Sequence, residues 1–544
     1  MAAGLVSAVA LTLVSFQPLG SPWWSGFDFD SAYVASALRL ARAERSIYYD
    51  HPGAPLQEAL AASFTAARVV SGEPRGERVD RWVADLDSTR PFLRTWGAFF
   101  FVASALLVFA TLAWVMGHPG WGVLGAVLFL GAPDLIPWAA VVKTDVLLAG
   151  LSVIAVGLTV QAYRRRSASL YLAAAAAVGY DVSVKVHAVG LLVPLAVAIA
   201  VRPPDDAWPR TFVRAARRWL AANRRLVAIV VATWAILIVL LNVTAAPPEA
   251  KPLLELLGGL AGIAAVGAVV WLALRRTRLA SRACITIGAV AAALAGLIVP
   301  NLLYASFPGP MARWLAITAT GGGVNEGARP ELNPLDVLEP WRLLLVVSAI
   351  GVAVVVRDRD WPTLLWAAGA LAMGFLAYLR YGELHYYAPA VALLVPLVLR
   401  TLSAITPRPG LIAAALAVAL AFTPYRVGID GARDRGTIAD RTERVNEWVE
   451  ARLRPGEVAL TQLESSDGRY FYLVRLYAPE GSPEPAYRFL PASHEAAEYV
   501  RDHDVRVGWL IAASPLDADS LLTGLGVDGH ARRVAAPGVV YRVS

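Results

Sequence analysis

Acidic and basic side chains gather where the apolar runs of this chain begin and end. The first run is followed by "GFDFDSAY" at residues 26–33, in which Asp28 and Asp30 stand two positions apart. In an extended segment their side chains point to opposite sides, so we expect only one to face a shared site. Asp50 and His51 follow in "YYDHPGAP". A carboxylate can act as a general base, and nearby cations can stabilise a departing anion.

Later apolar runs carry the same residue types at their ends: Lys143 and Asp145, Asp181, Lys185 and His187, and Glu383 and His385. The lysines stand out because the chain has only three, Lys143, Lys185 and Lys251. An ammonium is a compact point charge that suits a phosphate, whereas a guanidinium is a planar fork. Charges near a bilayer are costly, so a one-sided collection of them indicates a common site.

The composition predicts a polytopic membrane protein. The chain has 544 residues, of which 57% are hydrophobic and 17% charged, with a mean hydropathy of +0.53. The formal charge of +7 comes from arginine clusters between apolar runs, at 164–166, 210–225, 275–282, 357–359 and 400–408. This is the positive-inside pattern, so the basic charge reports topology and implies no nucleic-acid partner. The single cysteine, Cys284, excludes a disulfide framework within one chain.

Hydropathy over spanning-length windows predicts about thirteen helices. The expected spans are 2–20, 95–117, 121–138, 143–162, 168–184, 187–202, 226–246, 253–274, 283–303, 341–356, 361–379, 387–401 and 410–427. We interpret the first as a retained helix because no basic segment precedes it. With Met1 in the cytoplasm, the arginine clusters lie inside and the acid-rich loops outside.

Two large regions are expected outside. Loop 21–94 contains two amphipathic patterns, at 31–45 and 55–70, which predict helices lying in the membrane interface. Residues 428–544 predict a small soluble α/β domain with strands at 457–463, 506–513 and 538–543 and helices near 441–453 and 493–503. The predicted organisation is therefore a membrane domain at 1–427 followed by this extracytoplasmic domain.

The order of these motifs resembles the GT-C superfamily of membrane glycosyltransferases, in its branch of protein O-mannosyltransferases and lipid A aminoarabinose transferases. The resemblance rests on "DSAYVA" from Asp30, "YYDHPGAPL" from Tyr48, "KTDVLLAGL" from Lys143, "GYDVSVKVHAVGLLVP" from Gly179 and "RYGELHYYAPAVALLVP" from Arg380. It covers residues 20–200 well, 300–400 thinly and the tail not at all. Ser31 stands where the family often has Glu, and Gly53 where a second Pro is usual.

The resemblance implies an inverting transferase that moves a sugar from a polyprenyl-phosphate donor to an extracytoplasmic acceptor hydroxyl, in a bacterial cytoplasmic membrane. Asp30 is then the expected general base, with Asp28 second. Lys185, His51 and Arg380 are expected at the donor phosphate. Residues expected to orient these groups, the sugar or the acceptor are Asp145, Asp50, Tyr33, Tyr49 and His385. No cofactor is assigned, and a divalent metal stays open, with Glu383 and His385 as candidate ligands.

Each assignment has a structural alternative. Asp30 could only cap the helix that follows it, Asp145 could pair with Lys143, and Lys185 could extend from a helix end toward the headgroups. A lipid-linked sugar flippase or secondary transporter is the alternative function, which would favour charges at mid-membrane depth and paired broken helices. A cell-envelope assembly protein whose site has decayed is a third.

Overall fold

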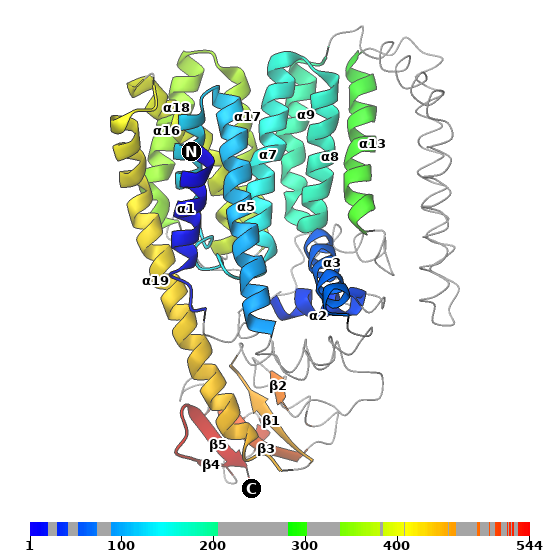
Figure 1. Cartoon of the computed structure of the whole chain (residues 1–544), viewed down its shortest axis with the longest axis vertical. Coiled ribbons are helices and arrows are strands. Elements are labelled where there is room, and N and C mark those ends of the chain that lie inside the picture. Colours follow the sequence, from blue (N-terminus) through cyan, green and yellow to red (C-terminus); the bar gives the residue numbers. More distant parts are fainter. Residues whose placement is uncertain are drawn as a thin grey trace, which may run out of the picture.

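A bundle of membrane-length helices carries a small β-sheet at one end (Figure 1). In this computed structural model the described residues are 1–19, 30–41, 53–72, 89–204, 281–301, 338–380, 384–406, 408–454, 456–463, 487–489, 500, 506–512, 519, 522–523, 525–526 and 531–543. The polytopic helical fold with a C-terminal sheet is as the sequence predicts.

Seven of the described helices are long and apolar enough to cross a membrane, and four apolar helices are shorter. The long spans include α5 (Arg90–Met116), α7 (Thr144–Arg165), α13 (Ser281–Asn301), α16 (Arg342–Arg357), α17 (Leu364–Arg380) and α18 (Ala388–Ile405). The short helices include α1 (Ala2–Val14), α6 (Pro119–Leu130) and α8 (Ala168–Val184). The predicted helices 226–246 and 253–274 lie outside the described residues.

Several helix boundaries differ from the prediction, among them that of α1, which ends at Val14 rather than at 20. Two of the differences lie next to charged residues. Helix α6 ends at Leu130 rather than near 138, because successive turns occupy 131–141 before α7 begins. The span predicted at 187–202 divides into a 3-10 segment, η3 (Val186–Leu191), and α9 (Leu192–Val201). Both changes create non-helical backbone next to Asp145 or Lys185.

Helices α8 and α13 pack closely because glycines face each other's backbone. A Cβ on Gly179 would overlap the backbone of Ala293, and one on Gly296 would overlap the carbonyl of Ala176. Small residues at such contacts let membrane helices approach closely. This contact fixes the helix whose end carries Lys185.

The two amphipathic helices predicted in the first outer loop are present as α2 (Asp30–Ala41) and α3 (Ala54–Ser71). They lie across the end of the bundle, near α8 and α13 (Figure 1). Their buried apolar faces, which include Leu38 and Leu60, pack together, and Phe64 of α3 stacks on Phe92 of α5 with ring centroids 5.2 Å apart. The pair thus docks on the bundle through the same residues that made the patterns amphipathic.

The last helix, α19 (Leu411–Glu450), runs unbroken from the bundle into the tail (Figure 1). The sequence predicted a span ending at 427 and a separate helix near 441. Hydropathy falls after residue 427, but polarity ends only the apolar segment, and the residues that follow can still continue a helix. A helix of this length extends roughly 60 Å, so it can link a membrane span to a soluble sheet.

The tail sheet has the strand order β2-β1-β3-β5-β4. Strands β1 (Glu457–Thr461), β3 (Arg506–Ala512) and β5 (Val539–Val543) fall where the sequence predicts strands. Two short strands, β2 (Tyr487–Phe489) and β4 (Ala531–Arg533), were not predicted. β1 pairs in parallel with β2 and β3, whereas β5 pairs antiparallel with β3 and β4. The predicted helix at 493–503 lies almost wholly outside the described residues.

Candidate functional site

Asp145 is positioned by the start of helix α7. Lys143, the residue before this helix, is extended, with φ −129° and ψ 140°, and the helix begins at Thr144. Asp145 therefore lies in the first turn, where unpaired backbone N–H groups and the helix dipole favour a negative charge. It is 1% exposed. An anion is thus fixed inside the protein at the end of a membrane helix.

Lys185 is positioned by a break between two helical segments. Helix α8 ends at Val184, Lys185 is extended with φ −157° and ψ 129°, and η3 begins at Val186. Its backbone N–H still donates to the carbonyl of Asp181, 2.9 Å away, while its side chain leaves the helix axis. The single extended residue directs the ammonium toward α7.

The two charges form a buried ion pair. The Lys185 Nζ donates to both carboxylate oxygens of Asp145, at 2.8 and 2.9 Å. Their side chains are 5% and 2% exposed. Asp145 therefore pairs with Lys185 across forty residues of sequence, and not with its neighbour Lys143 as the local alternative required.

An aromatic ring covers the ammonium of this pair. The Lys185 Nζ lies 4.0 Å from the ring centroid of Tyr386, in η6 (Leu384–Tyr387). The Tyr386 ring also contacts His187, at 5.6 Å between centroids, and His385, at 4.2 Å. The two imidazoles thus contact the ring that covers Lys185, and the segment before α18 carries both Tyr386 and His385.

Helix α2 reaches the same place through Tyr33. The Tyr33 and Thr144 hydroxyl oxygens are 3.4 Å apart, and Thr144 immediately precedes Asp145. Gly53, before α3, leaves space for this contact, since a Cβ there would lie 2.5 Å from Cε1 of Tyr33 and 3.3 Å from Cγ2 of Thr144. Asp30 is the first residue of α2, three residues before Tyr33. The helix therefore begins about one turn from this contact.

A second group of charges surrounds Trp138, in the turns between α6 and α7. Lys143 Nζ lies 3.7 Å from its ring centroid and the guanidinium of Arg435 lies 3.9 Å from it. Arg435, on α19, also donates to the Pro137 carbonyl and to Gln17. The sequence analysis did not single out Arg435, because nothing local separates it from the other arginines of α19.

Asp134, in the same turns, has a left-handed backbone with φ 55°. Burial raises the pKa of its carboxyl, and the nearby His385, Lys143 and Arg435 act in the opposite direction. These electrostatic contacts link the Trp138 group to the aromatic segment that covers Lys185. Residues far apart in the sequence therefore meet at one end of the bundle.

Several predicted site residues have no described side chain. Asp28, Tyr49, Asp50, His51 and Glu383 lie outside the described residues, and Asp30 and Arg380 are placed by their backbones alone. Arg380 is the last residue of α17, four positions before η6. Within the described part of the chain, no three His, Cys, Asp or Glu residues come together as metal ligands. The metal assignment stays a prediction.

No protein-family model and no curated protein matches the chain. Among solved structures, it is similar to ArnT from Cupriavidus metallidurans bound to undecaprenyl phosphate, with 14% identity, 99% of this chain and 97% of that chain covered, and a TM-score of 0.36. It is also similar to the Archaeoglobus fulgidus oligosaccharyltransferase in complex with Zn and sulfate, with 12% identity, 100% and 73% coverage, and a TM-score of 0.44.

Proposed function

We propose that the chain is an inverting membrane glycosyltransferase that moves a sugar from a polyprenyl-phosphate donor to an extracytoplasmic hydroxyl. The observation that carries the proposal is the buried Lys185–Asp145 pair with α2 docked beside it. Helix α2 begins at Asp30 and contacts Thr144, the residue before Asp145, through Tyr33. Sugar transfer from a phosphate needs a cation for the leaving phosphate and a base for the acceptor hydroxyl. A cation fixed near a carboxylate-bearing segment supplies both. The order of the sequence motifs supports the same reaction.

In the proposed reaction the acceptor oxygen attacks the anomeric carbon from the side opposite the phosphate. The bond from that carbon to the phosphate oxygen breaks, and the phosphate leaves with the electron pair. The Asp30 carboxylate takes the acceptor proton, with Asp28 as the second candidate. One displacement inverts the anomeric centre and forms no covalent sugar–enzyme intermediate.

Lys185 is the proposed partner of the leaving phosphate, together with His51 and Arg380. An ammonium has three N–H donors, and two of them are directed at the Asp145 oxygens. We propose that the third donor, on the side of the ammonium that the Tyr386 ring covers, binds a phosphate oxygen when the donor enters. Asp145 then orients the cation without using all its donors. Tyr33, Tyr49, Asp50 and His385 are proposed to orient the sugar or the acceptor.

Charges at the far end of the bundle support the proposed orientation in a bacterial cytoplasmic membrane. Arg164, near the last turn of α7, lies 3.6 Å from Asp360, and Arg400 of α18 lies 2.8 Å from Asp358. These arginines are at the opposite helix ends from Asp145 and Lys185. Under the positive-inside rule that end is cytoplasmic, so the proposed site and the tail sheet are extracytoplasmic.

One observation favours the alternative of a lipid-linked sugar flippase. The break at Lys185 interrupts the membrane path between α8 and α9, and broken helices form the binding sites of many transporters. A flippase would move the donor across the bilayer without consuming it. The two functions therefore differ in a measurable product.

The test is release of radiolabelled sugar from a panel of polyprenyl-phosphate sugars by purified protein, with crude cell envelope added as acceptor source. Wild type is compared with Asp30→Asn, and with Asp440→Asn as a control at an exposed carboxylate. Parallel samples with EDTA test the metal requirement. We expect wild type and the control to consume the sugar donor. Asp30→Asn is expected to bind the donor without consuming it. If wild type consumes no donor, the transferase proposal is wrong. If Asp30→Asn is active, Asp30 is not the general base.

A further inference from the structure

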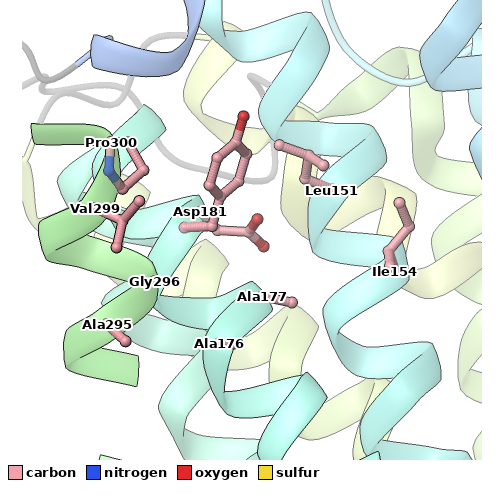
Figure 2. Close-up of a pocket in the computed structure, with 10 residues that line it drawn as sticks. Leu151, Ile154, Ala176, Ala177, Asp181, Ala295, Gly296, Val299 and Pro300 are labelled. Atoms are coloured by element: carbon pink, nitrogen blue, oxygen red, sulfur yellow. The ribbon is translucent and has the colours of Figure 1, made fainter. Parts of the chain in front are cut away.

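A cavity of about 430 Å³ lies between helices α7, α8 and α13 (Figure 2). Its walls are almost entirely aliphatic: Leu151 and Ile154 come from α7, Ala176 and Ala177 from α8, and Val299 from α13. The volume falls within the range of roughly 300 to 1,000 Å³ that is typical of small-molecule sites. The shape and lining suit an aliphatic chain.

One carboxylate lies in this apolar cavity. Asp181 is 1% exposed, and its side chain points into the space between α8 and the α7 residues Leu151 and Ile154 (Figure 2). Within the described part of the chain, neither of its carboxylate oxygens has a hydrogen-bond partner. Burying a charge without a partner is costly, so the position requires a donor from elsewhere.

The helix across the cavity adds a second hydrogen-bond acceptor. Pro300 stands inside α13 and has no N–H, so it cannot donate to the carbonyl of Gly296, four residues earlier. Gly296 and Pro300 both line the cavity. The Asp181 carboxylate and the Gly296 carbonyl both accept hydrogen bonds, which favours a ligand with several N–H or O–H donors.

Among the described residues that line the cavity, Asp181 is acidic and none is basic. The nearest cation in sequence, Lys185, directs its ammonium at Asp145. The Asp181 carboxyl thus lies in a cavity whose neighbouring ammonium is already paired, and this favours a cationic donor over a neutral hydroxyl.

We propose that this cavity binds the ammonium head of an aliphatic amine, with Asp181 as its counter-ion and the chain against Leu151, Ile154 and Val299. An ammonium supplies three N–H donors, enough for the carboxylate and the Gly296 carbonyl. Tyr180 and Val299 remain 37% and 62% exposed, so the rim is open in the described structure. The proposal rests on the cavity alone and does not depend on the transferase reaction.

The experiment uses the full chain in phosphatidylcholine nanodiscs and a hexadecylamine that carries a photoactivatable diazirine. Matched hexadecanol and hexadecanoic acid probes carry the same diazirine. Crosslinked peptides are identified by mass spectrometry. We expect the amine to label α7, α8 or α13 around the cavity, and the alcohol and the acid to label it about tenfold less, since a hydrogen bond between charged groups is the stronger one.

Variants separate the cavity from general membrane partitioning. Asp181→Asn removes the charge with little change in volume and is expected to reduce amine labelling about tenfold. Ala177→Phe fills the cavity and is expected to block labelling, whereas Asp440→Asn, an exposed acid, is expected to label like wild type. In the unmodified protein, excess dodecylamine should compete the signal away. Equal labelling by the three probes, or unchanged labelling of either cavity variant, would overturn the proposal.

Discussion

Lys185 lies at a break between helical segments and donates to both oxygens of Asp145, which begins another helix. Both side chains are buried. A buried ion pair gains little over an apolar pair of the same volume, because removing two charges from water costs about as much as their attraction returns. Stability alone therefore does not explain the pair, and the phosphate contact proposed for Lys185 gives it a reason.

Breaking this pair from one side is expected to destabilise the protein. Asp145→Asn leaves a buried ammonium without its counter-ion, and such a truncation costs about 3 to 5 kcal/mol. Lys185→Met should cost a similar amount. The double variant Asp145→Leu with Lys185→Met should regain most of the stability but no sugar transfer. Thermal unfolding in detergent and donor consumption check these outcomes, and transfer by the double variant would show that Lys185 has no role in it.

Gly53 is expected to couple α3 to the proposed site through Tyr33. Gly53→Ala places a methyl group 2.5 Å from the Tyr33 ring, so the ring or α3 must shift. Overpacking of this kind costs about 1 to 3 kcal/mol, and we expect donor turnover to fall with it. Gly4→Ala is the matched control because its Cβ would meet nothing within 4 Å. Equal turnover by the two variants would contradict the coupling.

Glu58 is expected to make stability depend on pH. Burial raises the pKa of its carboxyl from 4.5 to about 8. The folded protein thus holds a proton that the unfolded chain has lost, so the stabilising contribution is complete below pH 4.5 and is lost as pH rises through about 8. Glu58→Gln should flatten this decline, and the exposed Glu447→Gln should not. Unfolding temperatures measured from pH 5 to 9 provide the test.

Arg542 is expected to hold the tail sheet together across β3. Its two terminal nitrogens donate to Glu457 on β1, at 2.6 and 2.7 Å, and one also donates to the carbonyl of Gly508. This hydrogen bonding lowers the pKa of Glu457 to about 2. Because the folded-state pKa lies below the unfolded value of 4.5, the contribution is present above pH 4.5 and disappears as pH falls through 2.

Arg542→Ala leaves the Glu457 carboxylate buried without this partner and should destabilise the sheet by about 2 to 3 kcal/mol at neutral pH. Faster hydrogen exchange in β1 and β5 is the expected signal, with α7 unaffected. Arg506→Ala, an exposed position at the start of β3, is the control. Unchanged exchange in Arg542→Ala would show that strand pairing alone holds the sheet.

The sequence by itself determined most of the described membrane helices, the two amphipathic helices of the outer loop and the three main strands. These features depend on local periodicity, which a short window of the sequence is enough to detect. The apolar face of α2 and the continuous buried run of β3 are two examples. Short strands such as Ala531–Arg533 lack such a pattern and depend on a neighbouring strand for their hydrogen bonds.

Only the tertiary structure decided which charges meet. The sequence left Asp145 free to pair with Lys143, two residues away, yet its partner is Lys185, and Lys143 lies over Trp138 with Arg435 of a distant helix. The physical reason is that an ion pair depends on distance and burial, and these are set by how helices pack and where they break. The isolated carboxylate of Asp181 likewise became informative only when α13 closed a cavity around it.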